Sequence, residues 1–195
     1  GPGAGAMVAV SDSAYPNQPA MYVVDAGTQP ARITDRIVVT RDGAPATDLD
    51  LEAITPDGQG GFWLASEGDA DKGIPHQVVQ VDAAGAIRTR IALPEGLLAH
   101  QTRFGIEGIA LHDGTLWMAV QRGWGDDLAG QTKLLAYDLA GESWGAVAYP
   151  LDEPADGAWV GLSEMAIHGN WAYLVERDNQ IGAAAALKAL YRVPL

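Results

Sequence analysis

Cysteine is absent from this 195-residue chain. Its absence excludes disulfide bonds and thiolate metal sites. Exported and cytosolic proteins can both lack cysteine, so the composition leaves the cellular compartment open.

Positive charge is scarce. Twelve Lys and Arg residues stand against 25 Asp and Glu, which gives a formal net charge of −13 at pH 7. Binding to a polyanion needs a basic face, so we expect no nucleic-acid partner. An acidic chain can hold a cation, above all a divalent metal ion bound by carboxylates. For any single acidic residue, a solvated surface position is the alternative.

Long apolar runs are missing as well. None approaches the ~18 residues that a membrane-spanning helix needs, so the sequence predicts no membrane span. Hydrophobic residues make up 48% of the chain and charged residues 19%, as in an ordinary globular domain. Residues 1–7 (GPGAGAM) are interpreted as a linker or a cloning remnant, and no signal peptide is recognised.

Three short apolar runs contain a carboxylate at related positions. They read Leu51-Glu52-Ala53-Ile54, Ile106-Glu107-Gly108-Ile109 and Leu162-Ser163-Glu164-Met165, and each is followed by a turn and a second apolar run. Glu52 and Glu107 are 55 residues apart, and Glu107 and Glu164 are 57 apart. Such a repeat, with four short strands per unit, predicts an all-β fold: a β-propeller of four-stranded antiparallel blades.

The predicted propeller domain spans residues 8–195 and holds three to four blades. Its parts are a partial blade at 8–45, blades at 48–94 and 104–152, and a partial blade at 161–195. The first partial blade starts at a second strand and the last ends at a third strand, so the two overlap in strand type and cannot merge. Open strand edges are avoided in proteins, so we expect another segment or another copy to complete the ring. Residues 181–187 predict a loop or a helical turn.

Several of these runs resemble one known family. They are residues 50–54 (DLEAI), 63–69 (WLASEGD), 104–110 (FGIEGIA) and 174–178 (LVERD). The chain is similar in them to the later part of members of the "esterase-like activity of phytase" family of bacterial β-propellers. The resemblance implies a propeller fold, export to the periplasm or the medium, and hydrolysis of small-molecule esters or phosphoesters.

Glu52 and Glu107 are the predicted catalytic pair and metal ligands. The first strand of each propeller blade lines the central channel, so repeated carboxylates there would converge and need a cation. Ca²⁺ accepts six to eight oxygen ligands in flexible geometry, and Glu67 and Asp69 complete the predicted metal set. The alternative is that each Glu accepts hydrogen bonds from backbone amides of the next blade.

Glu164 fits this set less well. Aligning Leu162 with Ile106 places Ser163, not Glu164, opposite Glu107, and a one-residue slip reverses the face of a strand. Only a β-bulge would restore Glu164 to the carboxylate set.

Predicted substrate contacts lie at the ends of the second strands. Glu67, Gln121 and Glu176 align there, and Arg122 and Arg177 follow at matched places. Guanidinium groups bind phosphate and carboxylate in bidentate fashion, so Arg122, Arg177, Glu67 and Glu176 are predicted to bind the substrate. The alternative is a structural Arg–Glu pair between blades.

Two functions remain open on the sequence alone. The first is a hydrolase of esters or phosphoesters, assisted by Ca²⁺ in the channel. The second is a non-catalytic propeller that serves as a binding or assembly module. Gln121 interrupts the outer set of acids, and the incomplete blade count also favours the second function. No Gly-x-Ser-x-Gly motif occurs, which argues against an α/β-hydrolase triad.

Overall fold

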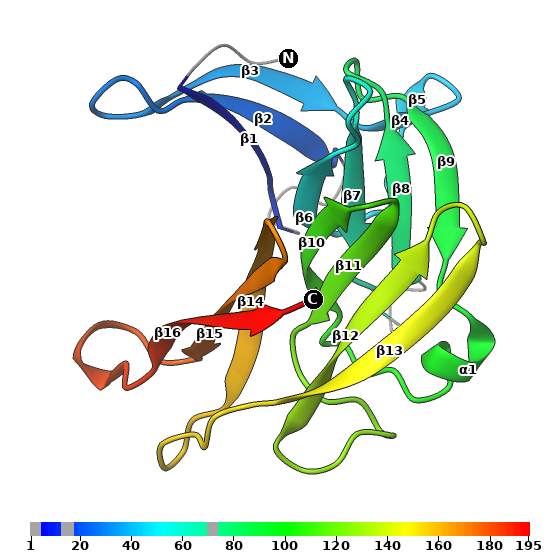
Figure 1. The fold of residues 1–195 in the computed structure, drawn as a ribbon. Helices are drawn as coiled ribbons and strands as arrows, with labels where there is room; N and C mark the ends of the chain where they lie inside the picture. Colours follow the sequence, from blue (N-terminus) through cyan, green and yellow to red (C-terminus); the bar gives the residue numbers. More distant parts are fainter. Residues whose placement is uncertain (1–4, 13–17, 70–73) are drawn as a thin grey trace. The chain divides into compact units, whose positions relative to one another are not determined.

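The computed structural model describes residues 5–12, 18–69 and 74–195, and these residues form antiparallel β-sheets with little helix. The chain divides into two compact units, Gly1–Leu93 and Pro94–Leu195. Figure 1 labels the strands of both units. The units are described separately below.

The first unit contains a three-stranded sheet, a short hairpin and a four-stranded sheet. The three-stranded sheet consists of β1 (Ala6–Val10), β2 (Ala20–Asp25) and β3 (Arg32–Val38). The hairpin pairs β4 (Thr40–Arg41) with β5 (Ala44–Pro45). The four-stranded sheet consists of β6 (Leu51–Pro56), β7 (Phe62–Ser66), β8 (Gln77–Val81) and β9 (Ile87–Ala92). In each sheet, strands that follow one another in the chain are neighbours.

The second unit contains a four-stranded and a three-stranded sheet. The four-stranded sheet consists of β10 (Ile106–His112), β11 (Thr115–Val120), β12 (Gln131–Asp138) and β13 (Ser143–Pro150). The three-stranded sheet consists of β14 (Val160–His168), β15 (Trp171–Asp178) and β16 (Lys188–Pro194). The helix α1 (Glu95–Leu98) precedes β10, and a 3-10 turn at Gly182–Ala184 precedes β16. This turn confirms the loop or helical turn expected at 181–187.

A bulge recurs in the first strand of three sheets. The pairing register skips Glu52 between β6 and β7, Glu107 between β10 and β11, and Ser163 between β14 and β15. A bulge places two residues opposite one and turns the extra side chain out of the regular alternation. The repeated unit of the sequence is therefore also a repeated backbone conformation.

A second irregularity relates β2 and β3 to β8 and β9. Thr34 in β3 and Arg88 in β9 have no partner in the strand pairing. Each lies opposite the end of the strand before it, β2 or β8. In both sheets an Asp at the end of that strand, Asp25 in β2 and Asp82 just after β8, accepts a hydrogen bond on its side chain from the amide two residues on. The strands β1, β2 and β3 thus correspond to the second, third and fourth strands of a complete sheet. Ala6 and Met7, expected in a linker, belong to β1.

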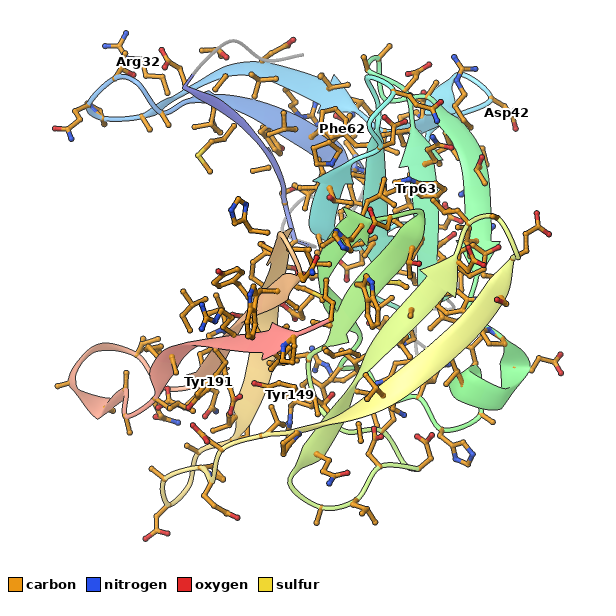
Figure 2. All side chains as sticks on the ribbon, in the orientation of Figure 1. Arg32, Asp42, Phe62, Trp63, Tyr149 and Tyr191 are labelled. Carbon is orange, nitrogen blue, oxygen red and sulfur yellow. The ribbon has the colours of Figure 1, made fainter. Side chains whose placement is uncertain are left out.

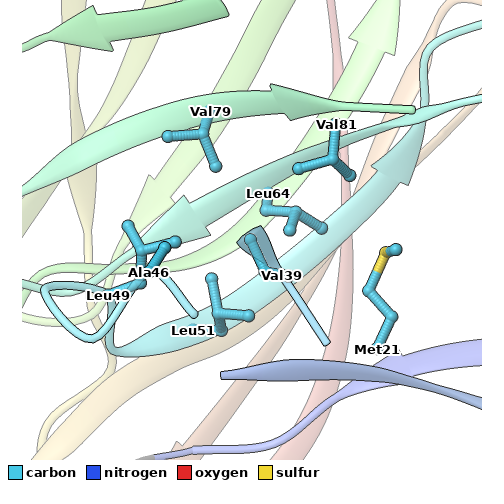
Figure 3. Packing of buried hydrophobic residues seen from close by; sticks show 8 residues of the cluster. All are labelled: Met21, Val39, Ala46, Leu49, Leu51, Leu64, Val79 and Val81. Atoms are coloured by element: carbon cyan, nitrogen blue, oxygen red, sulfur yellow. The ribbon is translucent and has the colours of Figure 1, made fainter. Parts of the chain in front are cut away.

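The core of the first unit is aliphatic. Figure 3 shows its buried cluster, which comprises Met21, Val39, Ala46, Leu49, Leu51, Leu64, Val79 and Val81. These side chains come from β2, from the hairpin region and from three strands of the β6–β9 sheet. Burial of both faces of a sheet explains why the apolar runs of β7 and β8 are nearly continuous rather than alternating.

The core of the second unit lies between its two sheets. The cluster combines residues of β10–β13 with residues of β14 and β15: Ala110, Ala119, Leu134, Tyr149, Leu162, Met165, Ala172 and Leu174. Gly108 allows β10 and β14 to approach, because a Cβ atom at this position would lie 2.4 Å from the backbone nitrogen of Met165. The prediction of an all-β chain with four-stranded antiparallel sheets is confirmed.

We expect the substitution Gly108→Ala to destabilise the second unit by about 1–3 kcal/mol, because the added methyl group collides with the backbone of β14. Urea unfolding followed by tryptophan fluorescence measures this loss. Gly145→Ala in β13 is the matched control, since a Cβ atom there would meet nothing within 4 Å. Equal stability of both variants would contradict the close approach.

Candidate functional site

The first unit brings three carboxylates together. Oxygen atoms of Asp12, Asp50 and Glu52 all lie within 4.8 Å of one another. Asp12 follows β1, Asp50 precedes β6, and Glu52 is the bulged residue of β6. The backbone of Asp50 is held at both ends: its amide donates to Ser66 Oγ (2.9 Å) and its carbonyl accepts from the amide of Glu67 (2.8 Å).

This group differs from the metal set expected from the sequence. Glu52 was expected there, but its neighbours in the group of three are Asp12 and Asp50, which sequence reasoning missed. Asp50 stands next but one to Glu52 in the run Asp50-Leu51-Glu52, and this spacing could have suggested it. The backbone of Asp69 forms a β-bridge with Ile74, and its role as a metal ligand stays a prediction. Asp12 is distant in sequence and could be found only once β1 was placed beside β6.

Three carboxylates at this separation suit a hard cation. Like charges that are close together favour protonation, an arginine partner or a bound metal ion. Carboxylate oxygens are the ligands that Ca²⁺ prefers, and three of them leave room for water or substrate in a coordination sphere of six to eight. Asp12, Asp50 and Glu52 are therefore the residues of the first unit that could hold Ca²⁺.

Glu107 has a different environment in the second unit. The side-chain amide of Gln121 donates a hydrogen bond to its carboxylate. Gln121 is buried, and its backbone carbonyl accepts a hydrogen bond of 3.0 Å from the amide of Leu162 in the adjacent sheet. Gln121, which interrupts the set of acids in the sequence, thus orients the carboxylate of Glu107. Convergence of Glu107 with Glu52, which lies in the other unit, stays a prediction.

Glu176 requires a correction. The register pairs Glu176 with Leu162, the place that Ser66 and Val120 hold in the other two sheets, and both of those residues are fully buried. Arg177, one residue later, is the counterpart of Glu67. A shift of one residue reverses the face of a strand, so Glu176 does not lie on the face that Glu67 occupies. Glu176 lines a mainly apolar cavity of the second unit, and its contact with a substrate stays a prediction.

The carboxylate of Glu176 has partners inside the second unit. It accepts hydrogen bonds from the hydroxyl group of Tyr149 (3.1 Å) and from the amide of Asp152 (2.6 Å). Only 1% of the residue is exposed, and desolvation raises its pKa above the ordinary value of 4.5. Desolvation and the nearby Glu176 also raise the pKa of Tyr149. We interpret this pair as structural.

Glu164 lies outside the carboxylate set, as the alignment predicted. It follows the bulge of β14 and takes the place of Ala53 and Gly108, whereas Ser163 is the counterpart of Glu52. The same bulge occurs in all three strands, so it does not restore the register. Its side chain is exposed, although nearby protein desolvates the carboxyl group and raises its pKa.

Arg122 lies against two aromatic rings of the second unit. Its guanidinium carbon is 4.5 Å from the centroid of Phe104 and 4.7 Å from that of Trp159. Arg177 approaches the same Trp159 ring at 6.0 Å. The register makes Asp178, not Arg177, the counterpart of Arg122, yet the fold brings both arginines to one tryptophan. Neither forms an ion pair with a carboxylate among the residues that the structure describes, so the expected alternative of an Arg–Glu pair is not seen there.

The described residues of the second unit line at least two cavities. One, of about 580 Å³, is lined by Arg122, Trp124, Trp159 and polar side chains of the neighbouring loops. The other, of about 620 Å³, is mainly apolar and lies between β13 and β16, with Tyr149 and Tyr191 in its wall (Figure 2). Tyr191 donates a hydrogen bond to Asp152 in that wall.

Comparison with known protein families assigns the chain to one of them. The model of the phytase-like family, described as "esterase-like activity of phytase", matches residues 1–195. The chain therefore belongs to this family. The family description supports a hydrolase-like activity in general terms, without a substrate or a metal ion.

Other comparisons add little. A mutant apocarotenoid oxygenase of Synechocystis is similar in structure at 13% sequence identity and a TM-score of 0.36. The match covers 93% of this chain and 45% of the oxygenase, so the chain spans less than half of that protein's length. A search of curated protein sequences found no match. No helix of the described residues is long and apolar enough to cross a membrane.

We expect Glu176 to make stability depend on pH. Its raised pKa means that the folded state binds the proton more tightly than the unfolded state, so this contribution is fully present below about pH 4.5 and is lost as pH rises through the folded pKa. Urea unfolding between pH 4 and 8 should show a smaller decline for Glu176→Gln than for the wild type. The exposed Glu153→Gln serves as control, and identical pH profiles of Glu176→Gln and wild type would contradict the assignment.

Proposed function

We propose that the chain is part of a phytase-like β-propeller that hydrolyses small-molecule esters or phosphoesters with the help of Ca²⁺. The observation that carries the proposal is the group of Asp12, Asp50 and Glu52, which gathers around the residue singled out by the sequence repeat. Membership of the family supports the reaction class. Export to the periplasm or the medium is proposed on the family resemblance.

The repeated sheets support the propeller. Two sheets have four antiparallel strands in chain order, and three sheets share a bulge in the first half of the strand that opens them, at the second residue of β6 and β10 and the fourth of β14. In the second unit, the first strands β10 and β14 pack side by side, as the innermost strands of adjacent blades do. Four related sheets in one chain fit consecutive blades.

The three carboxylates would hold the metal ion through their oxygen atoms. Bound there, Ca²⁺ would supply Lewis acidity toward a phosphoryl or carbonyl oxygen and lower the pKa of bound water. The bulge directs the side chain of Glu52 away from the apolar alternation of β6 and toward Asp50. The hydrogen bonds of the Asp50 backbone to Ser66 and Glu67 keep that loop in place.

We expect Ca²⁺ to bind the wild-type chain with measurable heat in isothermal titration calorimetry, and Asp50→Asn and Glu52→Gln each to weaken binding about tenfold or more, because each removes an anionic ligand. Asp42→Asn is the matched control, since Asp42 is an exposed carboxylate of the same unit (Figure 2). Turnover of an aryl ester and an aryl phosphate should fall in the same two variants. Absence of both Ca²⁺ binding and turnover in the wild type would reject the proposal.

An assembly module is the second candidate function, and the free edge of β16 favours it. Among the described residues β16 pairs only with β15, whereas the third strands β8 and β12 each pair on both sides. In the two four-stranded sheets, a fourth strand (β9 or β13) lies next to the third strand. The corresponding place beside β16 opens onto the apolar cavity next to β13. Leu190 on this strand is 67% exposed. A further strand, from another segment or another copy, would cover this edge.

If copies of the chain associate through this edge, Leu190→Lys should shift the wild-type oligomer toward the monomer, because a charge on an edge strand opposes pairing. Multi-angle light scattering over a concentration series measures the shift. Ile33→Lys on β3 is the control, since Ile33 is equally exposed at 66%. A wild-type chain that stays monomeric at every concentration would exclude association of copies.

A further inference from the structure

Arg122 has aromatic contacts where two lysines of the second unit have carboxylate partners. Lys133 lies 2.7 Å from Asp126 and 3.0 Å from Asp127, and Lys188 lies 2.6 Å from Asp178. Arg122 is half-buried, and its contacts are with the Phe104 and Trp159 rings rather than with a carboxylate. Among the residues that the structure describes, no carboxylate forms an ion pair with its guanidinium group.

The backbone at both aromatic residues is held by hydrogen bonds. The indole nitrogen of Trp124 donates to the carbonyl of Phe104 at 2.7 Å. Trp159 and Asn179 are joined twice: the amide of Trp159 donates to Asn179 Oδ1 (3.0 Å), and the amide of Asn179 donates to the carbonyl of Trp159 (3.1 Å). The rings also contact one another, with centroids 5.8 Å apart. The surface that carries Arg122 is thus built by the fold.

Arg122 and Trp159 line the cavity of about 580 Å³. The acids of the same cavity have partners of their own: Asp127 lies beside Lys133 and accepts from the amide of Trp124 (2.7 Å), and Asp152 accepts from Tyr191. Glu153 is exposed at the edge. Arg122 is consequently the cation of this cavity that a ligand can reach.

We propose that this cavity binds a phosphate-type oxyanion at Arg122. The two rings attract the guanidinium group and restrict its motion, which leaves its N–H groups for a bidentate contact with phosphate oxygens. Arg177, beside the same Trp159, adds positive potential without lining the cavity. The site goes beyond the proposed hydrolase, because it requires neither Ca²⁺ nor bond cleavage.

Titration of inorganic phosphate into the full chain, with a chelator present to remove Ca²⁺, tests the proposal. Binding is expected with a Kd on the order of 1 mM, as for a few charge-assisted hydrogen bonds. Arg122→Gln should weaken it about tenfold or more, Arg122→Lys should weaken it less, and Glu153→Gln should strengthen it by removing a nearby negative charge. Quenching of Trp159 fluorescence, lost in Trp159→Phe, would place the ligand in this cavity.

Arg192→Gln is the matched control. Arg192 lies 4.2 Å from the Trp171 ring but is exposed and lies outside this cavity, so its loss should leave phosphate binding unchanged. Equal binding by wild type and Arg122→Gln, or saturation with acetate but not with phosphate, would overturn the proposal. Circular dichroism establishes that the variants fold, and Arg122→Lys replaces Arg122→Gln if the latter does not. Because turnover is not measured, failure here is distinct from failure of the hydrolase.

Discussion

The β-bulge in the opening strand of three sheets is the constraint on which the candidate sites depend. A regular strand in an apolar core would direct every second side chain into that core, and a carboxylate there would be costly. The bulge gives the ladder one extra residue, so Glu52 and Glu107 can follow a buried leucine or isoleucine without being buried themselves. It also ends the regular pairing near the loop that carries Asp50.

The same bulge sets the pairing register where the second strand of each hairpin ends. At that place, a shift of one residue decides whether a side chain faces the core or the surface. Glu176 occupies the interior position and is matched by Tyr149 and a backbone amide, whereas Arg177 occupies the next position and reaches Trp159. The second unit therefore separates the hydrogen-bonded carboxylate of Glu176 from Arg122, which lines a cavity. The ligand contacts proposed for the second unit are cationic and aromatic, whereas those proposed for the first unit are anionic.

The repeat could be recognised from the sequence because strand order and turn residues recur every 55 to 57 positions. Glu52 could be chosen in advance for the same reason, because it breaks the apolar pattern at a repeated place; Arg122 was chosen by its alignment with Arg177, which the register does not support. Glu176 was aligned with Glu67 by residue type, although Arg177 is its structural counterpart. The run Glu176-Arg177-Asp178 permits either alignment in the sequence, and only the hydrogen-bond pairing of the strands distinguishes them. Asp12 could not be found, since no spacing rule links it to residue 52.

By itself, then, the sequence determined the strand order, the all-β class, the family and the carboxylate around which the first site gathers. These follow from local patterns of apolar residues, turns and charge along the chain. The tertiary structure alone decided which side chains face each other: Asp12 with Glu52, Gln121 with Glu107, and Arg122 with Phe104 and Trp159. Such contacts depend on which strands become neighbours and on single-residue register, and neither is encoded in the periodicity of one strand.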